Sequence, residues 1–234
     1  MLEFKNFSKK YGNKKAVNNL NLIIEEGDIY AFVGHNGAGK TTTLKAAAGI
    51  LPFEEGDILI DGISILNNPI LCKSKIAYLP DNPDLYEFLK GIDYLNFICD
   101  IYGVNDDRED LIKKYSDLFQ LTGFLGNTIN TYSHGMKQKL AIISSLIHKP
   151  KLLLLDEPFV GLDPESTHNL KEIMKEITKE GTAIFFSTHV LEVAEKLCNK
   201  VAVIKNGKLV ISGEMKKVLK DKSLEDVFME KIHE

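Results

Sequence analysis

Short apolar runs and segments with helical periodicity alternate along the chain. Runs bounded by turn residues predict buried strands at 76–79, 151–155, 183–186 and 201–204. Apolar residues spaced three or four positions apart predict helices at 92–102, 108–121, 136–147, 165–179 and 191–197. Strands that alternate with helices in this way favour a mainly parallel α/β sheet.

Turn signals predict antiparallel pairs near both ends of the chain. Residues 17–33 contain two apolar-rich segments joined by a polar turn at 25–28, which predicts a hairpin. Asn206-Gly207 separates the apolar segments 201–204 and 209–211 and is the strongest type of short hairpin signal. With a short strand predicted at 58–60, we interpret the N-terminal pairs as an antiparallel β subdomain.

Composition favours one globular domain. The chain has 234 residues, of which 44% are hydrophobic and 26% charged. No apolar stretch is long enough to cross a bilayer and the first residues lack a signal-peptide pattern, so we expect a cytoplasmic protein. The widely spaced Cys72, Cys99 and Cys198 are typical of reduced thiols, and a net charge of −4 does not favour nucleic acid as a partner.

A glycine-rich loop lies between a predicted strand and a helix predicted at 40–49. Residues 34–41 match the P-loop pattern G-x-x-x-x-G-K-[ST]. The backbone N–H groups of such a loop and the N-terminus of its helix surround triphosphate oxygens. Lys40 is expected at the β- and γ-phosphates, and the Thr41 hydroxyl on Mg²⁺. The nucleotide-binding residues predicted here are Gly34, His35, Asn36, Gly37, Ala38, Gly39, Lys40, Thr41 and Thr42.

Two acids follow the apolar run 152–155. Asp156 is expected at the C-terminal edge of a parallel strand, where open α/β sheets bind their ligands. This is a Walker B arrangement, and it predicts Asp156 as a second Mg²⁺ ligand. Adjacent Glu157 can accept a proton from a water aligned on the γ-phosphate, so it is the candidate general base.

The segment Tyr132-Ser133-His134-Gly135-Met136 resembles the Leu-Ser-Gly-Gly-Gln signature of ABC transporter ATPases. It lies about twenty residues before Asp156, and the resemblance extends over nearly the whole chain in the family's order. A hydroxyl and backbone amides at a helix N-terminus can cap a terminal phosphate. The resemblance therefore implies that Ser133 and Gly135 bind ATP.

The resemblance assigns roles to further positions. It implies that Tyr11 stacks on adenine and that His189 is the switch histidine at the γ-phosphate. Asp81 stands where the family usually has a glutamine that touches Mg²⁺ and the attacking water, and residues 161–163 resemble the D-loop. The implied cofactors are ATP and Mg²⁺, with Thr41, Asp81 and Asp156 as the metal ligands.

Three residues depart from the family pattern. Asp81 is shorter than glutamine and negatively charged, so it can bind Mg²⁺ without reaching the same water. His134 replaces the first signature glycine and adds bulk and a titratable ring, and Met136 replaces the glutamine. One hypothesis is that His134 makes turnover slow or pH-sensitive.

The predicted fold is an α/β P-loop NTPase core with a mainly parallel sheet, an N-terminal antiparallel β subdomain and an inserted helical subdomain. We expect one ABC ATPase domain over residues 1–234, with the core and β subdomain at 1–81 and 149–213. Apolar β-branched runs become sparse at 82–148, the expected helical subdomain, and 214–234 is expected to be a helical surface tail.

The resemblance implies the Mg-dependent ATPase subunit of a membrane transporter, peripheral on the cytoplasmic face of the membrane. Its implied partners are a second ATPase subunit, identical or not, paired head to tail, and a permease encoded separately. The tail at 223–228 and the spacing before the Walker B acids resemble exporter ATPases. The alternatives are a soluble ABC-type ATPase of ribosome or DNA metabolism and an ATP-binding regulatory module with low turnover.

Overall fold

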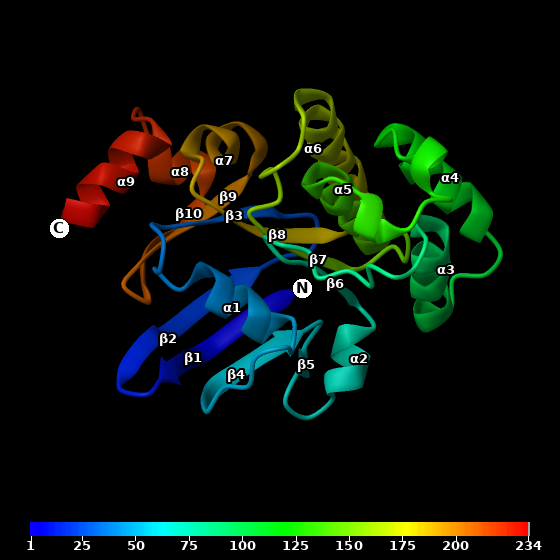
Figure 1. Ribbon diagram of the computed structural model, residues 1–234. Coiled ribbons are helices and arrows are strands. Elements are labelled where there is room, and N and C mark those ends of the chain that lie inside the picture. The colour runs from blue at the N-terminus through cyan, green and yellow to red at the C-terminus, as the bar shows by residue number, and fades with distance from the viewer. Residues whose placement is uncertain (234) are drawn as a thin grey trace.

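A six-stranded sheet lies at the centre of the molecule (Figure 1). The computed structural model describes residues 1–233 and gives this sheet the order β10-β9-β3-β8-β7-β6. Its strands are β3 (Ile29–Val33), β6 (Ile76–Leu79), β7 (Leu152–Asp156), β8 (Ala183–Thr188), β9 (Lys200–Lys205) and β10 (Lys208–Glu214). Within this sheet only β10 pairs antiparallel, across the predicted Asn206-Gly207 turn, so the mainly parallel core is confirmed.

A second, antiparallel sheet is formed by the N-terminal part of the chain. Its order is β2-β1-β4-β5, with β1 (Leu2–Tyr11), β2 (Lys14–Ile24), β4 (Glu55–Ile60) and β5 (Ile63–Ser64). The antiparallel β unit is thus confirmed, but the hairpin predicted over 17–33 is wrong because β2 and β3 enter different sheets. All five residues of β3 are buried, as in a central parallel strand, whereas the second half of β2 alternates between exposed and buried residues.

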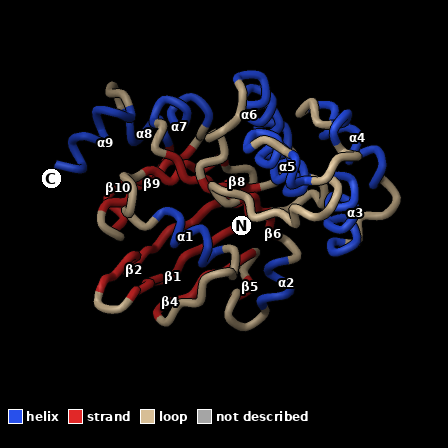
Figure 2. The backbone as a smooth tube through the Cα atoms, in the orientation of Figure 1, coloured by secondary structure: helices blue, strands red, loops and turns tan. Residues whose placement is uncertain are grey.

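Helices cover both faces of the central sheet (Figure 2). Helix α1 lies between the two sheets, whereas α5, α6 and α7 cover the opposite face, with α3 and α4 beside α5. The helices are α1 (Lys40–Ala47), α2 (Pro69–Lys73), α3 (Gly91–Tyr102), α4 (Arg108–Leu118), α5 (His134–Leu146), α6 (Pro164–Lys179), α7 (Leu191–Leu197), α8 (Met215–Leu219) and α9 (Leu224–His233). No helix within residues 1–233 has the length and apolar character needed to cross a membrane.

Most helix predictions are confirmed to within a few residues, and one needs correction. The short helix α2 was not predicted; it begins at Pro69, because the first helical position does not need a backbone N–H donor. The tail does contain two helices, α8 and α9, yet Met215, Leu224 and Val227 are buried, so the pair is anchored to the core. Residue 234, the last of the predicted tail, lies outside the described residues.

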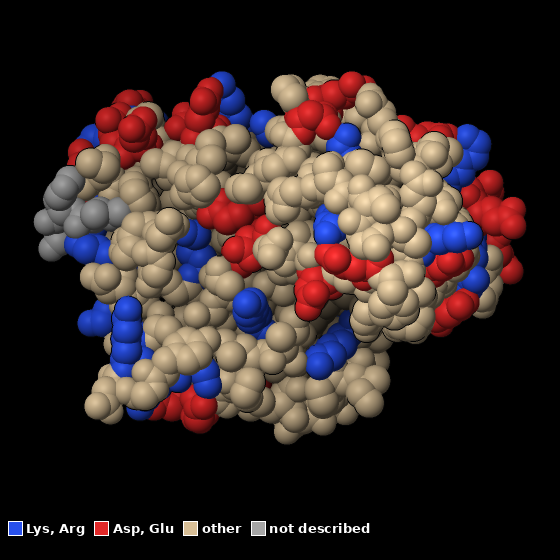
Figure 3. Space-filling view, viewed as in Figure 1, with Lys and Arg blue, Asp and Glu red and all other residues tan. Residues whose placement is uncertain are grey.

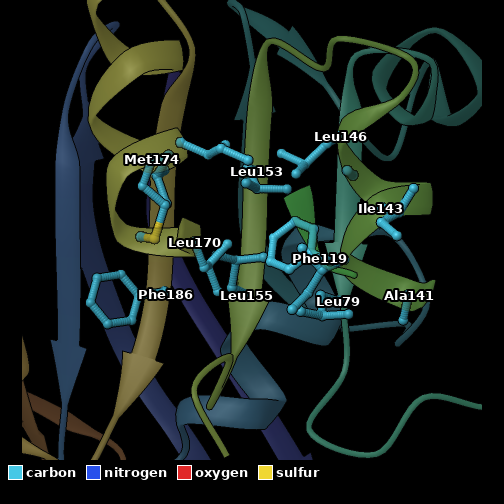
Figure 4. Packing of buried hydrophobic residues seen from close by; sticks show 14 of the residues in the cluster. Leu79, Phe119, Ala141, Ile143, Leu146, Leu153, Leu155, Leu170, Met174 and Phe186 are labelled. Atoms are coloured by element: carbon cyan, nitrogen blue, oxygen red, sulfur yellow. The ribbon is translucent and has the colours of Figure 1, made fainter. Parts of the chain in front are cut away.

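Each face of the central sheet packs against its own apolar cluster. Ile184 and Phe186 of β8 belong to the cluster on the side of α6, and Phe186 lies near Leu170 and Met174 of that helix (Figure 4). Phe185 points the other way and packs against Phe32 and the N-terminal sheet, with 5.2 Å between the two ring centroids. Because the strands are buried on both faces, the loops at their C-terminal edge start from fixed points.

Candidate functional site

The glycine-rich loop follows β3 and is packed tightly against neighbouring strands. A Cβ on Gly34 would lie 2.6 Å from the carbonyl oxygen of Ile204 in β9. A Cβ on Gly39, which has φ +114, would lie 2.5 Å from the carbonyl oxygen of Ala16 in β2. Both distances are shorter than a carbon–oxygen contact allows, so these positions require glycine and the loop has a fixed shape.

Lys40 is the cation at the base of this loop. Its side chain is only 7% exposed, and Nζ donates a hydrogen bond to the Gly34 carbonyl at 2.7 Å. Burial lowers the pKa of Lys40, while the charges of Glu157 and Asp156 oppose that shift. The ammonium group therefore lies where the loop amides and the helix N-terminus also favour an anion.

Asp156 ends β7 with one oxygen satisfied and the other free. The residue is 1% exposed, and Oδ1 accepts a hydrogen bond from the Ser187 hydroxyl. Oδ2 has no hydrogen-bond partner among the described residues. Burial raises the pKa of Asp156, and the Ser187 and Thr41 hydroxyls oppose the shift. A buried, unpartnered carboxylate oxygen near a threonine hydroxyl fits Mg²⁺, which prefers oxygen ligands.

Glu157 is held between a cation and a histidine. Its Oε2 lies 2.9 Å from Nδ1 of His189, and its Oε1 lies 3.8 Å from Nζ of Lys40. The backbone N–H donates to the Ser187 hydroxyl at 3.1 Å, and φ is +49, an uncommon conformation for a side-chain-bearing residue. Neighbouring strands thus fix a strained backbone that aims the Glu157 carboxylate between Lys40 and His189.

Most of the predicted nucleotide and metal residues meet around one cavity of about 430 Å³. The predicted residues that line it are Tyr11, His35, Asn36, Gly37, Gly39, Lys40, Thr41, Thr42, Asp81, Asp156 and Glu157. Gly34 and Ala38 belong to the same loop but do not line the cavity, and His189 reaches it only through Glu157. A larger groove of about 660 Å³ between the two sheets contains none of the predicted site residues.

Lys14 and Ala16 also line the cavity, and sequence reasoning missed them. They follow the tight turn after Tyr11, at the start of β2. The available signal was Gly12, a turn residue that returns the chain beside Tyr11. Without the pairing of β1 and β2, the sequence does not show that this turn faces the glycine-rich loop.

Tyr11 and Asp81 occupy the rim of the cavity. The Tyr11 side chain is 52% exposed, so its ring is open to a stacked base. Asp81 follows β6, and its Oδ1 accepts the Asn82 backbone N–H at 2.9 Å. The charge of Asp81 also raises the pKa of Asp156, so a cation bound near both acids would relieve their repulsion.

The predicted signature residues lie apart from the cavity. Ser133 caps α5, where its hydroxyl accepts the Met136 backbone N–H at 3.2 Å, and the residue is exposed. Gly135 lies in the first turn of the same helix. Neither residue lines the cavity, so one chain does not bring the signature and the glycine-rich loop around one nucleotide.

Several known proteins are similar to this chain in sequence and fold. The ABC transporter family model matches residues 17–160. An uncharacterized ABC transporter ATP-binding protein of Bacillus subtilis (strain 168), YhcH, is 36% identical over 90% of this chain and 68% of its own length. The lantibiotic transport ATP-binding protein SrtF of Streptococcus pyogenes is 35% identical over 92% of this chain and 91% of its own. A solved ATP-binding subunit of an ABC transporter has a TM-score of 0.95 and 31% identity, covering 99% of each chain. The chain therefore belongs to the ABC transporter family, as an ATP-binding subunit with the ABC ATPase fold.

Proposed function

We propose that this chain hydrolyses Mg-ATP in the cavity beside the glycine-rich loop and thereby powers a membrane transporter. The observation that carries the proposal is the placement of Glu157. Its carboxylate lies 3.8 Å from Lys40 and 2.9 Å from His189, next to the buried Asp156. A phosphate-binding cation, a metal ligand and a base are thus combined at one sheet edge.

Different cavity residues bind different parts of Mg-ATP. The loop amides and Lys40 hold the phosphates, and the open ring of Tyr11 stacks on the adenine. Thr41 and Asp156 would hold Mg²⁺, with Asp81 as an additional oxygen ligand from the rim. The bound ion would neutralise charge on the phosphate oxygens. On the face shown in Figure 3, acidic and basic side chains are interspersed, so phosphate recognition rests on this local set of groups.

Glu157 acts as the general base. Its carboxylate accepts a proton from a water while the water oxygen bonds to the γ-phosphorus. The bond between the γ-phosphorus and the β-phosphate oxygen breaks, which yields ADP and inorganic phosphate. The hydrogen bond from His189 keeps the Glu157 carboxylate aimed at that water, because Oε2 is already held at 2.9 Å.

A second subunit completes the site. Ser133 and Gly135 lie outside the cavity of their own chain, and their helix N-terminus offers N–H groups suited to a terminal phosphate. Two chains paired head to tail would place one chain's signature on the other chain's ATP. The dimer is therefore expected to form with ATP and to separate after hydrolysis.

We further propose that the transporter is an exporter whose permease is a separate chain. The similarity to SrtF, named for lantibiotic transport, supports this subclass. Co-expression with a membrane protein encoded beside this gene should give a complex with raised ATPase activity, and a complex with no such rise would contradict the assignment to an exporter with a separate permease.

Within the chain, the helices between β6 and β7 would form the helical subdomain at 82–148. The core would comprise residues 1–81 and 149–213.

The decisive variant is Glu157→Gln. It removes the base but keeps the size of the side chain, so turnover should fall by roughly 10²- to 10⁴-fold. ATP binding and ATP-dependent dimerisation should remain, as measured by equilibrium binding and light scattering. Glu109→Gln, at an exposed position of α4, is the matched control and should turn over normally. Retained hydrolysis in Glu157→Gln would remove this residue from the mechanism.

The alternative of a regulatory module with low turnover is tested by the same assay. Asp81 and His134 are the residues that favour it, because Asp81 replaces the usual glutamine at the cavity and His134 replaces the first signature glycine. A steady-state rate in saturating Mg-ATP near the background of Glu157→Gln would support the module. A rate well above that background supports the enzyme.

A further inference from the structure

The signature turn lies directly against the loop that follows Glu157. His134 is the first residue of α5, and a Cβ on Gly161 would lie 2.8 Å from Cδ2 and 3.0 Å from Nε2 of the His134 ring. Gly161 has φ +80, which glycine adopts without steric cost. The His134 ring therefore packs directly against the backbone of the loop at Gly161.

Two further contacts join the same helix to the same loop. A Cβ on Gly135 would lie 3.0 Å from the Gly161 carbonyl oxygen, so the two backbones are close. One turn later, Nζ of Lys139 lies 2.7 Å from Oδ2 of Asp163, and the Lys139 side chain is only 13% exposed. The first half of α5 thus holds the loop at residues 161 and 163.

The held part of the loop is close to the proposed base. Glu157 begins the loop, and its carbonyl accepts the Val160 backbone N–H at 3.2 Å, so Gly161 follows a turn that starts at Glu157. At the other end, Asp163 caps α6 by accepting the Ser166 N–H at 2.8 Å. With both ends fixed, a displacement at Gly161 is transmitted to Glu157, whose backbone is already strained at φ +49.

We propose that His134 is a positioning residue for Glu157 of its own chain. By packing against Gly161, the His134 ring fixes the conformation of the loop at 157–163. The loop conformation in turn orients the Glu157 carboxylate. The segment expected to meet a partner's ATP thereby also adjusts the base of its own site. This inference rests on the proposed function, since it takes Glu157 as the general base.

The kinetic test is a double-mutant cycle between His134 and Gly161. His134→Ala should lower kcat by about tenfold to 100-fold with little change in the KM for ATP, because His134 does not line the cavity. His134→Gln, which keeps a planar side chain of similar reach, should recover part of kcat. Gly161→Ala should be impaired by its clash with the ring, and adding His134→Ala should partly restore it. His168→Ala, an exposed histidine of α6, is the control and should leave kcat unchanged.

An activity-independent test uses hydrogen exchange of the ATP-free protein. Backbone amides at 158–163 should exchange several-fold faster in His134→Ala, while those at 34–41 keep the wild-type rate. Unchanged exchange in the loop, an additive cycle, or a rise in KM at constant kcat would each overturn the positioning role. A wild-type chain without hydrolysis would instead overturn the proposed function, and exchange would still decide the role of His134. If His134→Ala does not fold, His134→Gln and Gly161→Ala supply the comparison.

Discussion

The nucleotide cavity and the signature turn differ in how much of their structure one chain provides. Around the cavity, Lys40 is 7% exposed and Asp156 is 1% exposed, and both project from elements buried by the two apolar clusters. The signature turn is exposed, and a cap at Ser133 and the contact between His134 and Gly161 hold it in place. One chain supplies all the residues that line the cavity, whereas Ser133 and Gly135 of the signature turn do not line the cavity of their own chain.

The largest effect is expected from a methyl group on Gly39. In Gly39→Ala the new Cβ would lie 2.5 Å from the Ala16 carbonyl, so the loop cannot keep its shape and ATP affinity should fall at least about 1000-fold, or roughly 4 kcal/mol. Gly37→Ala is the matched control, because φ is also positive, at +77, but no atom lies within 4 Å of the Cβ. It should cost about 1–2 kcal/mol, or about tenfold in Kd measured by calorimetry. Equal losses in the two variants would show that close packing does not shape the cradle.

The next effect separates metal binding from nucleotide binding. Asp156→Ala removes the unpartnered Oδ2, so Mg-dependent turnover should fall about 1000-fold. Binding of ATP in the presence of EDTA should stay within a few-fold of wild type, since Lys40 and the loop amides remain. A full response to added Mg²⁺ in this variant would place the metal on other residues.

Substitutions at Ser133 test the role of the signature turn. Ser133→Ala removes the cap of α5 and the hydroxyl proposed to face a partner's ATP, so turnover should fall about tenfold to 100-fold. Binding of ATP to the separate chain should not change, because Ser133 is outside the cavity. Ser133→Thr keeps a capping hydroxyl and should retain most of the activity. Weakened ATP binding in the isolated Ser133→Ala chain would mean that the two regions are not independent.

The smallest predicted effect concerns the link between the two regions. Lys139 and the Ser166 N–H lower the pKa of Asp163 to about 2. Because the folded pKa is below the unfolded value of about 4, the ionised Asp163 stabilises the fold above about pH 4, and this stabilisation is lost as the pH falls toward 2. Asp163→Asn keeps a capping side chain but loses the ion pair, and Asp163 is 46% exposed. It should therefore lower the free energy of unfolding by only about 0.5 kcal/mol at pH 7 in urea titrations, and less below pH 4. A difference that does not shrink on acidification would assign the effect to something other than this charge.

Local patterns predicted much of the molecule because their causes are local. The glycine-rich loop, the helix starting at Lys40 and the strand ending at Asp156 depend on residues a few positions apart. The hairpin at 17–33 failed because a polar turn shows where the chain bends but not which sheet receives each strand. β1 was not predicted because its alternation of buried and exposed residues is interrupted. Asn6 has φ +50, and the register with the neighbouring strand shifts between Phe4 and Phe7.

The sequence by itself determined which chemical groups are present and the short elements that carry them. It supplied the P-loop, the acids Asp156 and Glu157, and the alternation of strands and helices, since spacing and turn chemistry act over a few residues. Only the tertiary structure decided which groups meet. Pairing of β7 with β8 places Asp156 beside Ser187 and brings His189 to Glu157 across 32 positions, while the signature at the start of α5 lies outside the cavity. These contacts depend on packing between elements that are far apart in the sequence. Short-range patterns of hydrophobic and polar residues do not specify which elements pack together.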